Sequence, residues 1–378
     1  MAITNKKKVV LGMSAGVDST VAAVLLQKQG YEVVGVFMHF WKEESSDKSK
    51  ENKCCSMESY EELKKICRQL DIKFVTANVE KEFKKEIVDY FLREYKLGRT
   101  PNPCIVCNQE IKFKILLKKM LEFKADFVAT GHYARIKREI INSKLKISNK
   151  LKIKNQKSKK AYKLFEGKDK EKDQSYFLYG LNQRQLARIL FPVGEYNKPE
   201  VRKLAKKFKL SVHNKKESQD ICFINSSVEK FLKNHLKLKK GKMTNQAGEV
   251  IGEHSGLPLY TLGQRKGINI GGDGPYYVSK KDFQKNILQV TNQKEEKSLY
   301  REEMNLDKVH WISDLKLEFP LKIKLRIRYR NPLVSAIIEL KNKKFLVKFD
   351  KSQKGVTPGQ FAVFYGKGGE VLGGGIIK

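Results

Sequence analysis

The first third of the chain alternates between short apolar runs and segments with helical spacing. The apolar runs are of strand length and lie at Val9–Leu11, Tyr31–Phe40, Phe74–Val79 and Asp126–Thr130. Because most of their positions are hydrophobic, they are typical of parallel strands that are buried on both faces of a sheet. We therefore predict a Rossmann-like α/β domain with helices on both faces of a parallel sheet.

The helices are predicted from apolar residues three and four positions apart. Three such segments are Glu58–Leu70, Phe83–Tyr95 and Lys198–Leu210. In a parallel sheet the functional groups gather at the carboxyl ends of the strands. This rule places Ser14, Met38 and His132 at one edge of the sheet, where we expect the chemistry.

The pattern changes after residue 225, and from Gly241 onward short strands alternate with Gly-rich turns. Lys322–Arg330 alternates strictly, with apolar side chains on one face and five cations on the other. Further strands are predicted at Ser335–Leu340, Lys344–Asp350 and Gln360–Tyr365. These segments predict a small antiparallel β-barrel with one basic face, which is either simply solvated or follows a phosphate backbone.

Three domains follow from these patterns. We predict an α/β catalytic domain over residues 1–225, a small central β-rich domain over 226–292 and a C-terminal antiparallel β-barrel over 293–378. The first domain carries a low-complexity basic insertion at about 137–160, with ten Lys or Arg residues and one acid. Its partial apolar alternation allows either an extended hairpin or a mobile basic loop.

The formal net charge of +35 predicts a polyanionic partner. The insertion accounts for a surplus of nine, so the basic character is spread over the whole chain. Nucleic acid is the favoured partner, and an anionic membrane surface is the alternative. No apolar run approaches the roughly 20 residues of a membrane span, and we expect no cleavable signal. Six cysteines in a chain of this length suit a reducing cytoplasm, where we expect the protein to reside.

The segment Lys8–Thr20, KVVLGMSAGVDST, joins the first strand to a helical segment through a Gly-, Ser- and Asp-rich turn. Such a turn at a helix N-terminus offers backbone N–H groups to an anion. The string from Ser14 to Ser19 resembles the SGGxDS signature of PP-loop ATP pyrophosphatases, with Ala15 in place of a glycine. If that position needs a positive φ, its Cβ costs about 1 kcal/mol. A plain Ser/Gly turn is the other interpretation.

Three cysteines stand out. Cys104 and Cys107 form a C-x-x-C pair after a proline-containing loop, which suggests half of a zinc site or a redox pair. The chain has no second C-x-x-C, so we do not expect a structural zinc. Cys222 lies in the apolar string ICFI, and on that ground alone it is typical of a buried structural cysteine.

Taken together, several motifs resemble one family. In order, they are GMSAGVDS, RTPNPCIVCNQEIKF, TGHYARI, KDQSYFLY, FPVGEYNKPEVRKLA, SQDICFI, GEHSGLPLYTLGQRKG and VTPGQFAVFYGKGGEVLGGGII. They are similar to the bacterial and organellar tRNA-specific 2-thiouridylases, and the resemblance extends from about Lys8 to the C-terminus. It implies a PP-loop domain, a small central domain and a β-barrel, with ATP and Mg²⁺ used to place sulfur on C2 of the wobble uridine.

The resemblance also implies roles for matching residues. The implied ATP site comprises Gly12, Met13, Ser14, Ala15, Gly16, Val17, Asp18, Ser19, Met38 and Gly131. Cys107 is implied as the nucleophile and Cys222 as the carrier of a persulfide, with a catalytic disulfide between them. The implied contacts with the target base are Asn102, Pro103 and Cys104. The implied tRNA contacts are Lys172, Asp173, Gln174, Arg328 and Tyr329, and two further functional positions are His132 and Gln360.

The implied chemistry needs these groups together. The uridine C2 oxygen is a poor leaving group until it is adenylated, and we expect Asp18 to act beside the phosphates, by polarisation or through Mg²⁺. A persulfide on Cys222 then meets the Cys107 thiolate, and a cysteine desulfurase or a relay protein supplies its sulfur. Many relatives have Asp where this chain has Cys104, and that third thiolate leaves an iron–sulfur cluster as an alternative. Other PP-loop enzymes, such as 4-thiouridine synthetases, lysidine synthetases or amide-forming ligases, and a non-catalytic RNA-binding protein are the competing interpretations.

Overall fold

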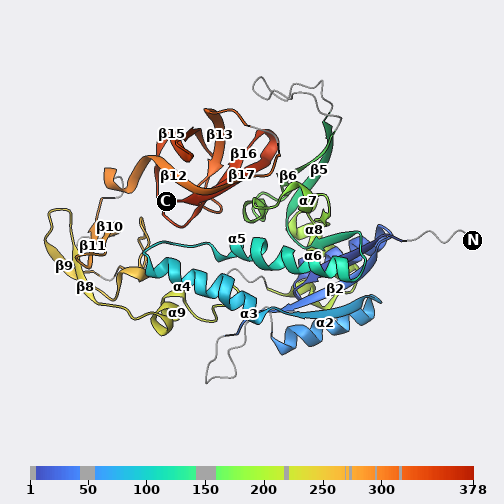
Figure 1. Cartoon of the computed structure of the whole chain (residues 1–378). Helices are drawn as coiled ribbons and strands as arrows, with labels where there is room; N and C mark the ends of the chain where they lie inside the picture. The colour runs from blue at the N-terminus through green and yellow to red at the C-terminus, as the bar shows by residue number, and fades with distance from the viewer. Residues whose placement is uncertain are drawn as a thin grey trace, which may run out of the picture.

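The computed structural model describes residues 6–42, 56–141, 159–216, 221–268, 270–271, 275–293, 296–314 and 317–378. A layer of helices runs from a parallel sheet near the N-terminus to a small sheet at the far end, and a β-barrel lies alongside it (Figure 1). The centre of the basic insertion, residues 142–158, lies outside the described residues. Among the described helices, none has the length and apolar content needed to cross a bilayer.

The N-terminal sheet has five strands in the order β3-β2-β1-β4-β7, and every neighbouring pair is parallel. The strands are β1 (Lys8–Met13), β2 (Glu32–His39), β3 (Lys73–Asn78), β4 (Phe127–Thr130) and β7 (Ile189–Leu190). Alternate residues of β1 enter different cores, with Val10 on one face and Val9 and Leu11 on the other. The predicted parallel sheet with helices on both faces is therefore confirmed.

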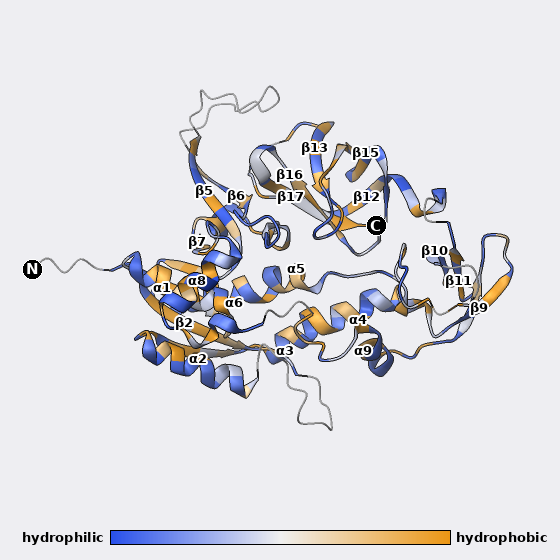
Figure 2. Ribbon diagram, turned by 180° about the vertical axis from the view of Figure 1, so that it is seen from behind, coloured by the Kyte–Doolittle hydropathy of each residue, from blue (hydrophilic) through white to orange (hydrophobic). Residues whose placement is uncertain are grey.

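Helices cover both faces of this sheet. The helices of the described residues are α1 (Val17–Lys28), α2 (Met57–Gln69), α3 (Glu80–Phe83), α4 (Asp89–Lys96), α5 (Pro103–Cys107), α6 (Phe113–Glu122), α7 (Gln183–Leu186), α8 (Lys198–Lys207) and α9 (Val228–His235). Of these, α4 and α9 lie beyond the parallel sheet, towards the small sheet (Figure 1). Helix α1 packs against α8, and the hydrophobic colours on α1 and β2 in Figure 2 match their burial. Helix α8 begins with a capping box in which Glu200 accepts a hydrogen bond from the Asn197 N–H group at 2.6 Å.

Two π-helical turns interrupt the helical layer. One, Lys84–Val88, joins α3 to α4, and the other, Asn108–Lys112, joins α5 to α6. In the second turn the Phe113 N–H group donates to the Asn108 carbonyl, five residues back. A π turn has a different residue period from an α-helix, so it changes which side chains share a face.

The flanks of the basic insertion form an antiparallel hairpin of β5 (Ala134–Ile141) and β6 (Lys159–Glu166). Of the two conformations left open by the sequence, the described flanks have the extended one. Strand β6 continues into the C-terminal sheet by pairing with β17. The α/β domain thus shares a sheet with the barrel.

The C-terminal barrel contains β12 (Tyr300–Trp311), β13 (Leu321–Arg326), β14 (Val334–Lys341), β15 (Lys344–Lys354), β16 (Phe361–Tyr365) and β17 (Glu370–Ile377). All neighbouring pairs are antiparallel, and the pairing of β12 with β17 closes the barrel. The central sheet contains β8 (Gly241–Thr244), β9 (Val250–His254), β10 (Tyr277–Asp282) and β11 (Ile287–Thr291), in the order β10-β11-β8-β9. The predicted succession of architectures is confirmed.

The prediction of a strand with one basic, exposed face over Lys322–Arg330 is partly wrong. Strand β13 ends at Arg326, and the chain turns at Arg330, which has a φ of 64°. Lys322 and Lys324 are exposed as predicted, but Arg326 faces two carboxylates of the α/β domain and is only 17% exposed. The alternation identified the barrel face of this strand correctly, but it could not show that another domain covers part of the basic face.

Candidate active site

A cavity of about 220 Å³ opens at the carboxyl ends of β1, β2 and β4. Its lining includes eight residues of the predicted ATP site, namely Gly12, Met13, Ser14, Gly16, Asp18, Ser19, Met38 and Gly131. The other two, Ala15 and Val17, are buried beneath the loop. Phe37, Phe40, Lys112, Leu116, Thr130, His132 and Gln174 complete the lining. The structure therefore brings the predicted ATP residues together, and their role in binding stays a prediction.

The loop that begins this cavity is shaped for an anion. Ala15 has a φ of 53°, the left-handed conformation that the glycine-like position required. The Ser14 N–H group donates to Ser19 Oγ at 3.3 Å, which closes the turn. Among the residues that the structure describes, no side chain caps the first turn of α1 at Gly16, and the N-terminal end of that helix borders the cavity. Gly131 is needed for close packing, because a Cβ there would lie 2.7 Å from Ser19 N.

Asp18 lies at the centre of a polar contact between α1 and α8. Lys198 Nζ donates to both carboxylate oxygens of Asp18 at 2.8 Å, and the Tyr133 hydroxyl donates to Oδ1 at 2.7 Å. The Lys198 side chain is only 8% exposed, whereas that of Asp18 is 29% exposed. The carboxylate is thus held at the cavity edge, with part of its surface still open to the cavity.

His132 is a neutral side chain of the cavity wall. Its Nδ1 lies 2.7 Å from Thr130 Oγ1, and its ring stacks on Phe113 with an interplanar angle of 27°. Burial, together with the nearby Lys112 ammonium, lowers the pKa of His132 to about 3. At physiological pH the imidazole therefore presents a hydrogen-bonding group to the cavity and no charge.

The neutral state of this half-buried imidazole predicts a loss of stability in acid. In the unfolded chain His132 takes up a proton below about pH 6.5, while the folded protein resists that proton until about pH 3. Its contribution to stability is therefore complete above pH 6.5 and is lost as the pH falls, by up to about 1.4 kcal/mol per pH unit. Denaturant unfolding of the wild type and His132→Gln at about pH 7.5 and about pH 4.5 should show a smaller acid loss in the variant. Equal losses in the two proteins would contradict the neutral assignment.

The three predicted cysteines occupy different environments. Cys107 ends α5 and is buried, Cys104 is exposed on the same helix, and Cys222 is half-buried rather than fully buried. Cys107 and Cys222 border the same hydrophobic core, and no disulfide joins the cysteines of the described residues. Burial raises the pKa of the Cys107 thiol to about 11, Cys104 raises it further, and the Lys112 ammonium acts in the opposite direction.

The loop that leads into α5 is held by all three domains. Thr100 donates its N–H group to the Pro358 carbonyl at 2.9 Å and shares a 3.0 Å hydroxyl contact with Thr261 of the central domain. Gln360 of the barrel donates to the Thr100 carbonyl at 2.7 Å. Asn102 then caps α5 by accepting from the Ile105 N–H group. Gln360 thus positions the cysteine helix here, and its predicted functional role remains untested.

The predicted tRNA residues from two distant segments meet beside the barrel. Lys172 and Tyr329 line a groove of about 480 Å³ together with Lys170, Glu171, Asp173, Arg326 and Arg330. Tyr329 packs on Phe177 with ring centroids 4.4 Å apart. Arg328 is not among the residues that line this groove. Its Nη2 donates to Thr357 Oγ1 at 3.1 Å, and burial lowers the pKa of its guanidinium. Gln174 instead lines the cavity at the carboxyl ends of β1, β2 and β4, where its backbone and side chain bind the backbone of Tyr133.

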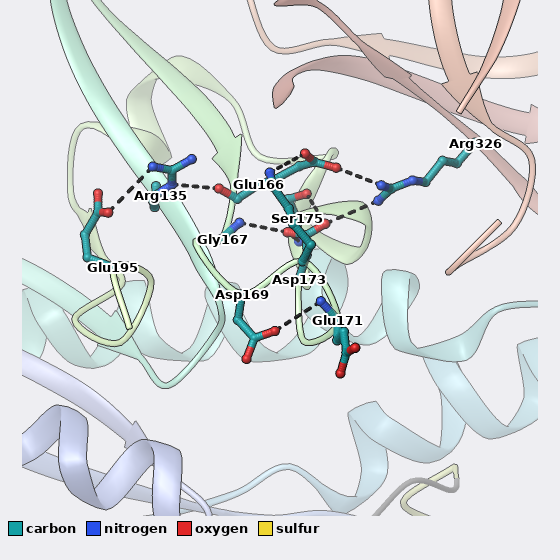
Figure 3. Close-up of polar contacts among 10 residues, drawn as sticks. Arg135, Glu166, Gly167, Asp169, Glu171, Asp173, Ser175, Glu195 and Arg326 are labelled. Atoms are coloured by element: carbon teal, nitrogen blue, oxygen red, sulfur yellow. Dashed lines mark hydrogen bonds and ion pairs between the residues drawn. The ribbon is translucent and has the colours of Figure 1, made fainter. Parts of the chain in front are cut away.

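Asp173 is an interior residue of this loop. It is 2% exposed and accepts hydrogen bonds from the Gly167 and Ser175 N–H groups and from Ser175 Oγ. Figure 3 shows Asp173 and Glu166 directed at Arg326, with nitrogen–oxygen distances of 3.4 and 2.8 Å. In this state the carboxylate positions the loop between the hairpin and the barrel, and a direct tRNA contact stays a prediction.

Comparisons with known proteins place the chain in a family. Residues 7–226 match the family described as the tRNA methyl transferase HUP domain, residues 229–292 its PRC-barrel domain, and residues 301–377 the aminomethyltransferase β-barrel domain. The chain is 42% identical to the tRNA-specific 2-thiouridylase MnmA of Geobacillus thermodenitrificans, over 99% of this chain and 95% of the relative. The MnmA proteins of Halothermothrix orenii (43%, over 98% and 99%) and Alkaliphilus oremlandii (44%, over 98% and 96%) are similar over the same extent. The chain belongs to the tRNA-specific 2-thiouridylase family.

Two cations beside this cavity, Lys198 and Lys112, were not predicted from the sequence. Lys198 was placed correctly on an amphipathic helix, but no motif marked it as the partner of Asp18. Lys112 lies in the motif CNQEIKF, in which the resemblance implies a role only for Cys107. Lys112 reaches the face of Cys107, five residues earlier, only across the π turn, which the sequence pattern does not predict.

Proposed function

We propose that this protein is an ATP-dependent tRNA uridine 2-sulfurtransferase that acts on the wobble uridine of the anticodon loop. The observation that carries the proposal is that one helical run, α5 to α6, holds Cys107 and also forms a wall of the cavity beside the anion loop. A site that activates a carbonyl and then transfers sulfur needs the phosphate loop and the thiol at one place. The proposal places the enzyme in the reducing cytoplasm.

The first step is activation of the base. The uridine C2 oxygen attacks the α-phosphorus of ATP, a new O–P bond forms, the bond to the β-phosphate breaks, and pyrophosphate leaves. The N-terminus of α1 and the loop from Ser14 to Ser19 receive the developing negative charge. Mg²⁺ enters with ATP as part of the substrate, and the partly exposed Asp18 carboxylate is its candidate ligand.

The second step is sulfur transfer. The terminal sulfur of a Cys222 persulfide adds to C2, and AMP leaves with the former C2 oxygen. The Cys107 thiolate then attacks Cys222 Sγ, the S–S bond to the terminal sulfur breaks, and that sulfur remains as the C2 thiocarbonyl. A Cys107–Cys222 disulfide results, and an external dithiol must reduce it. A persulfide-bearing donor, either a cysteine desulfurase or a relay protein, reloads Cys222.

The tRNA is held by basic surface outside the cavity. The groove between Lys172 and Arg330 combines cations with the Tyr329 ring, a combination that suits phosphate contacts and base stacking. The wobble base must leave the anticodon stack to reach the cavity, and the exposed first turn of α5, with Asn102, Pro103 and Cys104, is the surface that meets it.

The iron–sulfur alternative does not fit the described site. No three Cys, His, Asp or Glu side chains among the described residues are grouped closely enough to hold a metal ion, so Cys104, Cys107 and Cys222 do not form a ready cluster site. We therefore base the mechanism on the persulfide. A 4-thiouridine synthetase would require sulfur at C4, which is the outcome that the test below distinguishes.

The test is direct product analysis. Purified protein, MgATP, an unmodified tRNA transcript with a wobble uridine and a persulfide donor should yield 2-thiouridine, with one pyrophosphate released per sulfur incorporated. The control is the same transcript with cytidine at the wobble position, which should give neither product. Formation of 4-thiouridine, or of a methylated nucleoside when a methyl donor is added, would overturn the proposal.

A further inference from the structure

Lys112 ends the π turn that follows α5, the helix of Cys107, and its side chain lines the cavity beside the anion loop. We propose that its ammonium serves both steps of the reaction, first by binding the phosphates of the nucleotide and then by stabilising the Cys107 thiolate. The inference rests on the proposed function, and it adds to that function a residue that controls the order of the two steps.

The π turn gives Lys112 its position. Helix α5 ends at Cys107, the turn spans Asn108–Lys112, and α6 begins at Phe113. In a regular α-helix a residue five positions on lies about 140° around the axis, on a different face. In a π turn the backbone bonds join residues five apart, so these residues lie nearly one above the other. The extra residue in this turn therefore brings Lys112 towards the face that carries Cys107.

On the nucleotide side, Lys112 supplies charge that the rest of the cavity lacks. Among the described residues that line the cavity, it is the one with a permanent positive charge. His132 cannot replace it, because the pKa of that imidazole is about 3. The Lys198 ammonium is bound to both oxygens of Asp18. A triphosphate that enters beside the N-terminus of α1 thus shares this cavity with the Lys112 side chain.

On the sulfur side, the same ammonium opposes the effect of burial. The buried Cys107 thiol has a pKa raised to about 11, and Lys112 is the group that lowers it. The thiolate is the reactive form of Cys107, so loss of the Lys112 charge lowers the fraction of thiolate and slows the reactions of this residue. Cys104, three residues earlier, has the reverse effect on the same thiol.

The two roles are coupled because one charge is shared. While phosphates occupy Lys112 they compensate its charge, the pKa of Cys107 rises, and the thiol stays protonated. When pyrophosphate and then AMP leave, the ammonium again favours the thiolate. Deprotonation of the Cys107 thiol is thereby delayed until the base has been activated. This delay protects the Cys222 persulfide from early attack by Cys107.

The first test measures the reactivity of Cys107 directly. Iodoacetamide labels the protein at about pH 8.5, and tandem mass spectrometry assigns the label to Cys104 or Cys107. Lys112→Met should slow labelling of Cys107 about fivefold, because the thiolate fraction falls when the ammonium is removed, while Lys112→Arg stays near the wild type. Lys114→Met is the matched control, since Lys114 is 60% exposed two residues further on.

The wild type provides a test that needs no variant. AMP should slow labelling of Cys107 several-fold, whereas adenosine, which has no phosphate, should have little effect. In Lys112→Met, AMP and adenosine should no longer differ. Equal effects of AMP and adenosine in the wild type would overturn the inference, even if Lys112→Met failed to fold.

The second test measures the nucleotide role. Lys112→Met should raise the KM for ATP in tRNA-dependent pyrophosphate release about tenfold, with Lys112→Arg and Lys114→Met close to the wild type. A change in the KM alone, or in labelling alone, would overturn the shared role. Absence of 2-thiouridine with the wild-type protein would instead overturn the proposed function, and the labelling results do not depend on that product.

Discussion

Cys107→Ala and Cys222→Ala are each expected to abolish 2-thiouridine formation, while Cys104→Ala keeps much of the activity. In the persulfide mechanism Cys222 carries the sulfur and Cys107 breaks the S–S bond, so neither can be replaced. Cys104 is exposed on the first turn of α5, where its thiol is not required for either step. Both inactive variants should still release pyrophosphate with tRNA, because activation precedes sulfur transfer.

The matched control is Cys67→Ala, which removes a buried thiol on α2, in the core on the other face of the sheet. It should lower stability by about 1 kcal/mol and leave thiolation intact. Product is measured by nucleoside mass spectrometry, and iron is measured on protein purified without oxygen. Comparable losses from all three substitutions at Cys104, Cys107 and Cys222, together with bound iron, would replace the persulfide mechanism by a cluster mechanism.

The parallel sheet and the anion loop could be predicted from the sequence because both have local causes. Strands buried on both faces need continuous apolar runs, and β1 and β2 have them. The positive φ of Ala15 follows from its place in a motif where glycine is usual. These features depend on neighbouring residues, so a single sequence contains them.

The cations of the site could not be singled out in the same way. The chain contains 77 Lys and Arg residues, so a lysine is the ordinary polar residue here and carries little information. Lys198 becomes significant only through Asp18, 180 positions earlier. Lys112 becomes significant only through a π turn, which the helical period of 3.6 residues does not predict.

Arg326 shows how tertiary contacts can reverse a correct local pattern. Its strand alternates between apolar and basic residues, which predicts a basic side chain in water. The acids that cover it, Glu166 and Asp173, come from the end of the β5–β6 hairpin and the loop after it, more than 150 positions earlier. The three groups compensate one another inside the structure, so part of the predicted basic face joins two domains instead of facing tRNA.

Asp18→Asn is expected to reduce thiolation by at least about a hundredfold and to leave tRNA affinity nearly unchanged. The carboxylate lies at the edge of the nucleotide cavity, where loss of its charge removes the candidate partner of MgATP. The predicted tRNA groove is formed by other residues, around Lys172 and Tyr329. A loss of tRNA affinity as large as the loss of turnover would contradict this separation.

The same substitution removes the Asp18 carboxylate that Lys198 contacts, and this second effect must be separated from catalysis. A buried ammonium that loses its carboxylate costs about 3–5 kcal/mol, so Asp18→Asn should also lower the melting temperature. The double variant Asp18→Asn with Lys198→Met removes both charges and should recover most of the stability without recovering pyrophosphate release. If the double variant regained thiolation, Asp18 would be only the structural partner of Lys198, and another group would have to meet the phosphates.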